Sequence, residues 1–272
     1  MNSENKFVKP NTSLLRLMGA DFFSFWHHKS FWVASSLALF SGLTLAFVSY
    51  LAADFVTSNF GADTGISASL VASHSLNSAI VIYGLIAVSI WLVSDFQHRR
   101  IQNTLCIGYS RSKYFISKFT ISSLFLVFLQ VISFCTAYAL ALILLPTPKI
   151  LPDTNIISNA TLFASLALSL WEQLALGALF AAVAFLTRNV AISLISSICV
   201  VTLLPLMAKV FNFVMSSVYE ITFNFNQVLA THYIATVPAD VEHYVLYGLG
   251  VGAAFLLIPT LIAFWHFKLS DV

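Results

Sequence analysis

Long apolar runs alternate with short polar breaks along the chain, and this pattern predicts its elements. Six of the runs are about as long as the roughly 20 residues that a helix needs to cross about 30 Å of hydrocarbon. We therefore expect an all-α membrane protein with six transmembrane helices in one domain, residues 1–272. The expected spans are residues 31–55, 71–94, 119–145, 161–187, 190–210 and 244–267.

A shorter amphipathic segment, residues 11–29, precedes the first span. Ser13 is a suitable N-cap for a helix there, and such a helix would lie in the membrane interface. The alternative is a frayed extension of the first span. One broad apolar face is expected to contain Leu14, Leu15, Leu17, Met18, Phe22 and Phe25.

Residues 211–243, before the sixth span, form an aromatic-rich segment that is too polar to span cleanly and too long for a simple turn. Tyr and Phe rings with polar neighbours suit short helices in the outer interface. An ordered surface loop without function is the alternative.

The composition agrees with a membrane protein and excludes several other classes. Hydrophobic residues make up 59% of the chain and charged residues 9%, whereas soluble domains carry roughly 25% charged residues. A net charge of +2 is too small to argue for nucleic acid as a partner. Cys106, Cys135 and Cys199 lie far apart with no ligand spacing, so we expect neither a disulfide framework nor a metal site.

The basic residues predict the orientation. Lysines and arginines gather before the first span, between the second and third, between the fourth and fifth, and after the sixth. The opposite side keeps only Lys149 and Lys209. Cytoplasmic segments near spans are enriched in such residues, so both termini are expected in the cytoplasm.

Catalytic signatures are missing from the sequence. A phosphate-binding loop GxxxxGK[ST] is absent, and no glycine is followed by lysine. Neither HExxH nor GxSxG occurs. We therefore expect no enzyme activity and no cofactor bound by this chain.

A polar stripe follows the fourth expected span. Glu172 falls about halfway along it, where a charge should face protein or water, or be protonated. The stripe could have one of three roles: it lines a substrate path, it lines a hydrated interface between protomers, or it provides hydrogen bonds that hold the bundle together. Its members are Glu172, Ser169, Ser165, Thr161 and Ser158, with Gln130 and Ser133 at a comparable depth in the third span.

The longest strongly charged interruption is residues 95–118, DFQHRRIQNTLCIGYSRSKYFISK. This segment resembles the loop after the second span of type-two ABC transporter permeases, which has an acidic residue, a T/I-x-N-x-L run, G-x-S-R and a lysine. The "G-T" of that family is replaced by Arg99 and Arg100. The matching positions are Asp95, Arg99, Arg100, Ile101, Asn103, Leu105, Gly108, Ser110, Arg111 and Lys118.

The resemblance implies a membrane subunit of a bacterial ABC exporter in the plasma membrane. Two permease subunits, identical or different, would enclose the path, and separate ATP-binding subunits would carry ATP and Mg. Residues 101–112 would include a coupling helix that docks on the ATP-binding subunit. Leu105 and Tyr109 would be its apolar contacts, and Arg99, Arg100 and Arg111 its charged contacts. The implied cargo is an amphipathic or antimicrobial peptide, or a lipid-like compound.

Three alternatives to this interpretation stay open. The loop is simply a basic cytoplasmic segment, the protein is a secondary transporter without an ATPase, or it is a membrane scaffold or sensor that transports nothing.

Overall fold

The computed structural model describes helices and the turns between them, with no strand among the residues it describes. Side chains are described for most of these residues; those of residues 60, 80, 159–165, 241–248 and 251 are not. The described residues are 13–60, 71–72, 75, 80–98, 100–145, 159–199 and 241–270.

Seven labelled helices follow one another along this part of the chain. A further helix, Val190–Cys199, comes directly after α7. The labelled helices are α1 (Leu14–Trp26), α2 (Lys29–Phe60), α4 (Ile80–Gln97), α5 (Arg100–Cys106), α6 (Arg111–Leu144), α7 (Asn159–Thr187) and α11 (Val241–Leu269).

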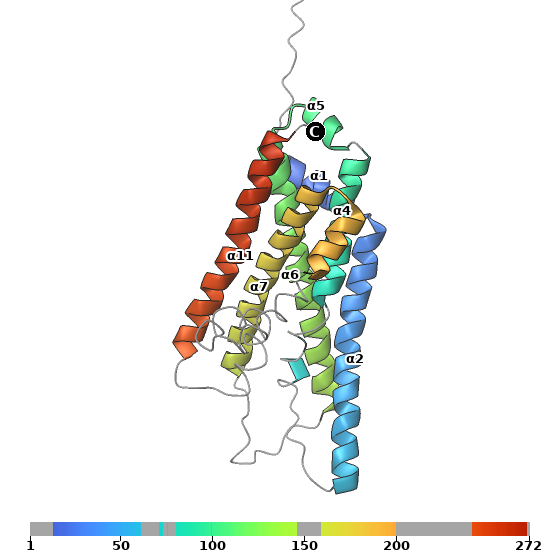
Figure 1. Ribbon diagram of the computed structural model, residues 1–272. Helices are drawn as coiled ribbons and strands as arrows, with labels where there is room; N and C mark the ends of the chain where they lie inside the picture. Colours follow the sequence, from blue (N-terminus) through green and yellow to red (C-terminus); the bar gives the residue numbers. More distant parts are fainter. Residues whose placement is uncertain are drawn as a thin grey trace, which may run out of the picture.

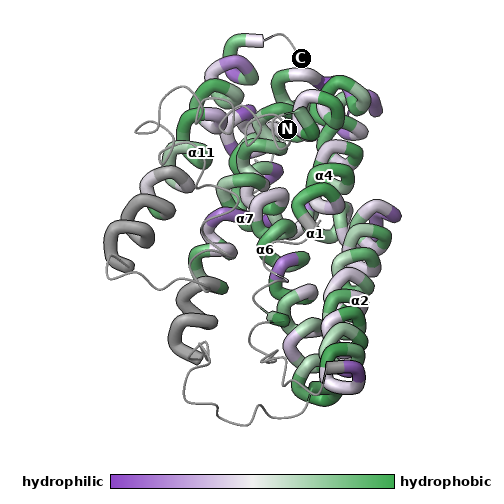
Figure 2. The backbone as a smooth tube through the Cα atoms, turned by 60° about the horizontal axis from the view of Figure 1, so that its bottom comes forward, coloured by the Kyte–Doolittle hydropathy of each residue, from purple (hydrophilic) through white to green (hydrophobic). Residues whose placement is uncertain are grey.

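Several of these helices can cross a membrane. Four, namely α2, α6, α7 and α11, are long and apolar enough, and the count becomes five if α4 and α5, bent by 64° at their break, form one span. Figure 2 shows hydrophobic residues along most of the length of the long helices. Large apolar side chains such as Phe40, Val48 and Trp265 are exposed, as a lipid-facing surface requires. The structure thus indicates a membrane-embedded helical protein.

The expected boundaries need correction in several places. The third span begins at Arg111 instead of residue 119, because Ser110 caps the helix and Lys118 is buried within it. The first span continues to Phe60, beyond residue 55. The second is described from Ile80, and the fifth only as far as Cys199, so six spans are not established. Residues 211–240 of the expected outer segment lie outside the described residues.

The amphipathic segment forms the expected helix, and the structure confirms its cap. The hydroxyl of Ser13 accepts a hydrogen bond from the Arg16 backbone N–H at 3.4 Å. Its buried side chains are Leu17, Asp21 and Phe25, and Leu15 is 80% exposed. The face that packs against the bundle is therefore narrower than expected and contains a carboxylate.

Helix α6 is central to the arrangement. It contacts α1, α2, α4, α7 and α11, and α7 also packs against α4 and α11. In Figure 1, α2 and α11 stand at opposite sides of the bundle, with α6 and α7 between them and α5 at one end. We call this the α5 end of the bundle.

Aromatic rings fill the core near the α5 end. Phe25, Phe31, Trp91 and Phe125 bring together α1, α2, α4 and α6, with ring centroids 4.4–5.4 Å apart. A second cluster joins α4, α6, α7 and α11. Its members are Phe96, Tyr114, Phe115, Phe185 and Phe267.

Helices α6 and α7 approach closely at Gly177. A Cβ there would lie 2.6 Å from the Cα of Ser123 and 3.1 Å from the carbonyl oxygen of Ser122. Both obstacles are backbone atoms, so neither can rotate away. Small residues allow this kind of close helix packing in membrane proteins.

We expect Gly177→Ala to destabilise the protein by about 1–3 kcal/mol, the usual cost of overpacking a tight core. The matched control is Gly250→Ala on α11, where a Cβ meets no atom within 4 Å. The measurement is the loss of monodisperse protein on heating in detergent. Equal melting temperatures for the two variants would contradict the packing argument.

Candidate functional site

The two ends of the charged loop meet inside the bundle. Asp95 lies near the end of α4 and Lys118 lies in the first part of α6. The Lys118 ammonium forms ion pairs with Asp95 Oδ2 and, at 2.9 Å, with Asp21 Oδ1 of α1. These three residues, here called the ion-pair cluster, join three elements that are distant in sequence.

Neighbouring polar groups complete the cluster. The Ser117 hydroxyl donates to Asp21 Oδ2 at 2.5 Å, and the Tyr114 hydroxyl donates to Asp95 Oδ2 at 3.1 Å. The guanidinium of Arg100, on α5, lies 3.6 Å from Asp95 Oδ1. Both carboxylates therefore have a hydroxyl donor as well as a cation.

The cluster is shielded from solvent by aromatic rings. Asp95 and Lys118 are each 2% exposed. The Lys118 ammonium lies 4.2 Å from the centre of the Trp91 ring, a distance that gives a cation–π attraction. Burying these charges costs several kcal/mol per ion, so they must be paired to stay ionised.

The charges of Arg100 and Asp95 also affect the imidazole of His28. Its burial lowers the pKa below the ordinary 6.5, the positive charge of Arg100 lowers it further, and Asp95 opposes both. His28 is in the turn between α1 and α2, and its Nδ1 is 2.7 Å from the Ser30 hydroxyl. At neutral pH its neutral form is favoured beside Arg100.

The loop between Asp95 and Lys118 has a fixed shape. Ile101 is 1% exposed and anchors α5 to the core. Gly108 has a φ of 103°, which side chains with a Cβ rarely adopt. The hydroxyl of Ser110 accepts a hydrogen bond from the Lys113 backbone N–H at 3.3 Å and so caps α6.

Two arginines hold the end of α11. Arg111 donates to the carbonyl oxygens of Lys268, at 3.3 Å, and Ser270, at 2.6 Å. Arg188 donates to the Ser270 hydroxyl, and its guanidinium lies 5.6 Å from the Phe96 ring centre. The last carbonyls of a helix carry partial negative charge and lack partners within the helix, so these cations stabilise it.

The structure divides the predicted loop residues into two groups. Ile101 and Arg111 contact the bundle itself, and Leu105 and Tyr109 are half-buried against its core. Arg100, Asn103, Gly108 and Ser110 are exposed, while Arg99 lies outside the described residues.

Sequence reasoning missed two features of this site. Asp21 completes the ion-pair cluster from α1, and an acidic residue on the apolar face of an amphipathic helix could have revealed it. Ile107 is 58% exposed in the turn between α5 and α6, although isoleucine is more often buried.

The polar stripe is partly described. Gln130 and Ser169 are buried, and Glu172 is 9% exposed. The side-chain amide of Gln130 donates to the carbonyl oxygen of Ser75 at 3.4 Å. Among the described residues, the Ser169 hydroxyl and the Gln130 side-chain oxygen have no hydrogen-bond partner. The side chain of Ser165 lies outside them, and the substrate path stays a prediction.

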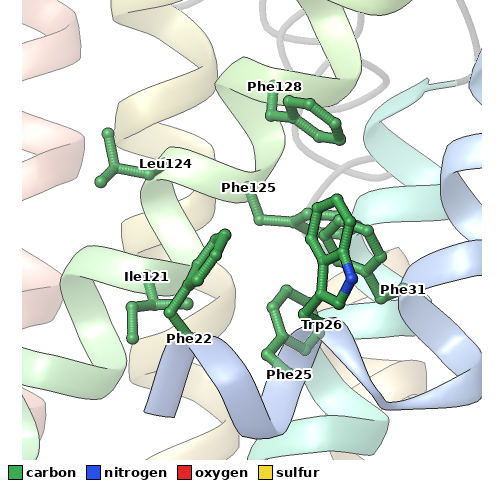
Figure 3. A pocket seen from close by; sticks show the side chains of 8 residues that line it. All are labelled: Phe22, Phe25, Trp26, Phe31, Ile121, Leu124, Phe125 and Phe128. Carbon is green, nitrogen blue, oxygen red and sulfur yellow. The ribbon is translucent and has the colours of Figure 1, made fainter. Parts of the chain in front are cut away.

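An apolar pocket of about 220 Å³ lies between α1 and α6 (Figure 3). Phe22, Phe25 and Trp26 of α1 face Phe125 and Phe128 of α6 across it. None of its lining residues is charged. The pocket can hold hydrocarbon but cannot orient a polar group.

Comparison of the chain with protein-family models and with curated proteins finds no match. Function must therefore be argued from the ion-pair cluster, the loop and the surfaces around them. Within the described ranges, no three His, Cys, Asp or Glu side chains are grouped so that they could hold a metal ion.

We expect Lys118→Met to be strongly destabilising, by about 3–5 kcal/mol, because it leaves two buried carboxylates without their shared cation. Adding Asp95→Asn should restore part of the loss, since residues in one charge network are not additive. Thermal melting in detergent measures both effects.

The matched control is Lys268→Met at the same end of the bundle, whose side chain is exposed. Its melting temperature should equal that of the wild type. A loss for Lys118→Met no larger than for this control would show that the ion pairs do not hold the three elements together.

Proposed function

We propose that this chain is the permease subunit of an ATP-driven exporter and that residues 100–110 bind a separate ATP-binding subunit. The observation that carries the proposal is the geometry of the loop. A short helix, α5, lies across one end of the bundle (Figure 1), and both ends of its loop are fixed by the ion-pair cluster. An exposed, rigidly anchored element is what a partner needs in order to move a bundle.

The surface of the loop supports a protein partner. Ile107 presents an exposed apolar side chain beside exposed Gln102, Asn103 and Cys106. Arg100, at the other end of α5, adds a positive charge to the same loop, and its side chain is 52% exposed. An apolar contact with a charged rim is a common arrangement in protein interfaces.

The ion-pair cluster supplies the route for movement. A displacement of α5 acts on Asp95 through Arg100, and Asp95 shares Lys118 with Asp21 of α1. The loop, α6 and α1 therefore move together. Nucleotide binding on the partner would bias two arrangements of the bundle, and the transported molecule would be released outward by the change between them.

The remaining parts of the proposal follow from the resemblance of the loop. A second permease subunit would complete the path, and ATP and Mg would bind the partner. The bacterial plasma membrane is the proposed location, with both termini in the cytoplasm. Amphipathic or antimicrobial peptides, or lipid-like compounds, are the proposed cargo.

A secondary transporter is the second candidate function. Glu172 favours it, since an acidic side chain buried within a membrane-spanning helix is characteristic of coupled transport. A transporter of this kind would bind no ATP-binding subunit, so the two proposals differ in a measurable property.

Labelling of the native cysteine in the loop tests the orientation. In a Cys135→Ser, Cys199→Ser background, Cys106 is exposed and should react with a membrane-impermeant maleimide in inside-out vesicles but not in intact cells. A second variant lacks the three native cysteines and carries Ser58→Cys, at an exposed position near the end of α2 that is distant from α5. It should react in intact cells but not in inside-out vesicles. Labelling of Cys106 in intact cells would place the loop outside.

Purification from native membranes tests the partner. A protein that a photoreactive ATP analogue labels should co-purify with the wild-type chain. We expect Ile107→Asp to reduce that protein about tenfold, equivalent to about 1.4 kcal/mol, because it replaces an apolar contact with a charge that the interface would have to desolvate.

The control is Leu269→Asp, which changes an exposed apolar side chain at the same end of the bundle but outside the loop. It should keep the partner. Absence of any ATP-labelled protein with the wild type would favour the secondary transporter, and equal retention by both variants would exclude Ile107 from the interface.

A further inference from the structure

A groove of about 310 Å³ lies between α2 and α4 on the outside of the bundle. Val33 and Leu37 of α2 form one wall, and Ile86 and Ile90 of α4 form the other. Three of the four side chains, those of Val33, Leu37 and Ile86, are clearly exposed within the described part of the chain. The groove is thus apolar along its walls and open on the outer surface of the bundle.

The mouth of the groove differs in character from its walls. His28, Lys29 and Ser30 line it where α2 begins. Lys29 is exposed, and the positive end of the α2 dipole adds to its charge. Arg100 lies nearby, but it is paired with Asp95 and the two charges act on His28 in opposite directions, so Lys29 provides the cation at this end.

The length of the groove matches half a bilayer. From Lys29 to Leu37 the α2 axis rises about 12 Å, and the hydrocarbon of one leaflet is roughly 15 Å thick. A molecule with an anionic head and a hydrocarbon tail can therefore place its head at Lys29 and its tail between Val33 and Ile86.

We propose that this groove binds one anionic phospholipid, with the phosphate at Lys29 and Ser30 and an acyl chain between α2 and α4. The complementary charge at the mouth distinguishes it from the pocket in Figure 3, which has no charged lining residue. The site goes beyond the proposed export function and does not depend on an ATP-binding partner.

Native mass spectrometry of the delipidated full chain tests the site. Phosphatidylglycerol and phosphatidylcholine with identical acyl chains are the two probes. The wild type should bind phosphatidylglycerol more tightly. Lys29→Ala should weaken that binding about fivefold, the usual effect of one basic residue near an anionic lipid. It should weaken phosphatidylcholine binding much less, because the choline group of that lipid compensates the charge of its phosphate. Lys29→Arg should keep the preference.

A larger side chain in the groove provides an independent test of the site. Ile86→Trp should reduce the binding of both lipids, because the indole occupies the space of the acyl chain. The controls are Lys268→Ala, which removes an exposed cation elsewhere, and Ile262→Trp, which enlarges an exposed apolar side chain on α11. Neither control should change lipid binding.

Three results would overturn the proposal. Equal losses for Lys29→Ala and Lys268→Ala would mean general attraction to the charged surface. Unchanged lipid binding in Ile86→Trp would place the acyl chain elsewhere. Loss of a dimer in Ile86→Trp, with lipid binding retained, would assign the groove to a second copy of the chain.

Discussion

The burial of Lys118 is the constraint on which the α5 end of the bundle depends. An ammonium with 2% exposure in an apolar core is tolerable only where carboxylates compensate it. Those carboxylates come from α1 and α4, so the start of α6 fixes both helices in position. Trp91 and Tyr114 then close the cluster with apolar area and one hydrogen bond. A change that separates any of these elements must break a buried charge pair.

This constraint changes the meaning of the loop motif. Asp95, Lys118, Gly108 and Ser110 have structural roles, as the two ion-paired ends, the positive-φ turn and the helix cap. The residues that carry the resemblance therefore explain why the loop has its shape. In the proposed complex, contact with the ATP-binding subunit would fall to the exposed positions between them, of which Ile107 is the most apolar.

The helices were predictable because their apolar runs are long, and the cap at Ser13 was predictable from local chemistry. The ion-pair cluster was not, since Lys118 on α6 and Asp21 on α1 lie far apart in the sequence and no local pattern shows that they meet. A prediction from runs of apolar residues also starts the third span too late, because it assigns Lys118 to the polar loop. Likewise, the sequence shows Arg111 as a cation near a span but does not show the carbonyl oxygens at the end of α11 to which it donates.

The turn between α1 and α2 connects the ion-pair cluster to the groove. His28 lines the groove, and the charges of Arg100 and Asp95 act on it in opposite directions. An anion at Lys29 would raise the pKa of His28, because a nearby opposite charge favours the protonated ring. Arg100 has the contrary effect, so any shift of α5 that moves Arg100 alters the electrostatic potential at the mouth of the groove. Lipid binding at the groove and the position of α5 would therefore be linked through the charges of Arg100, Asp95 and His28.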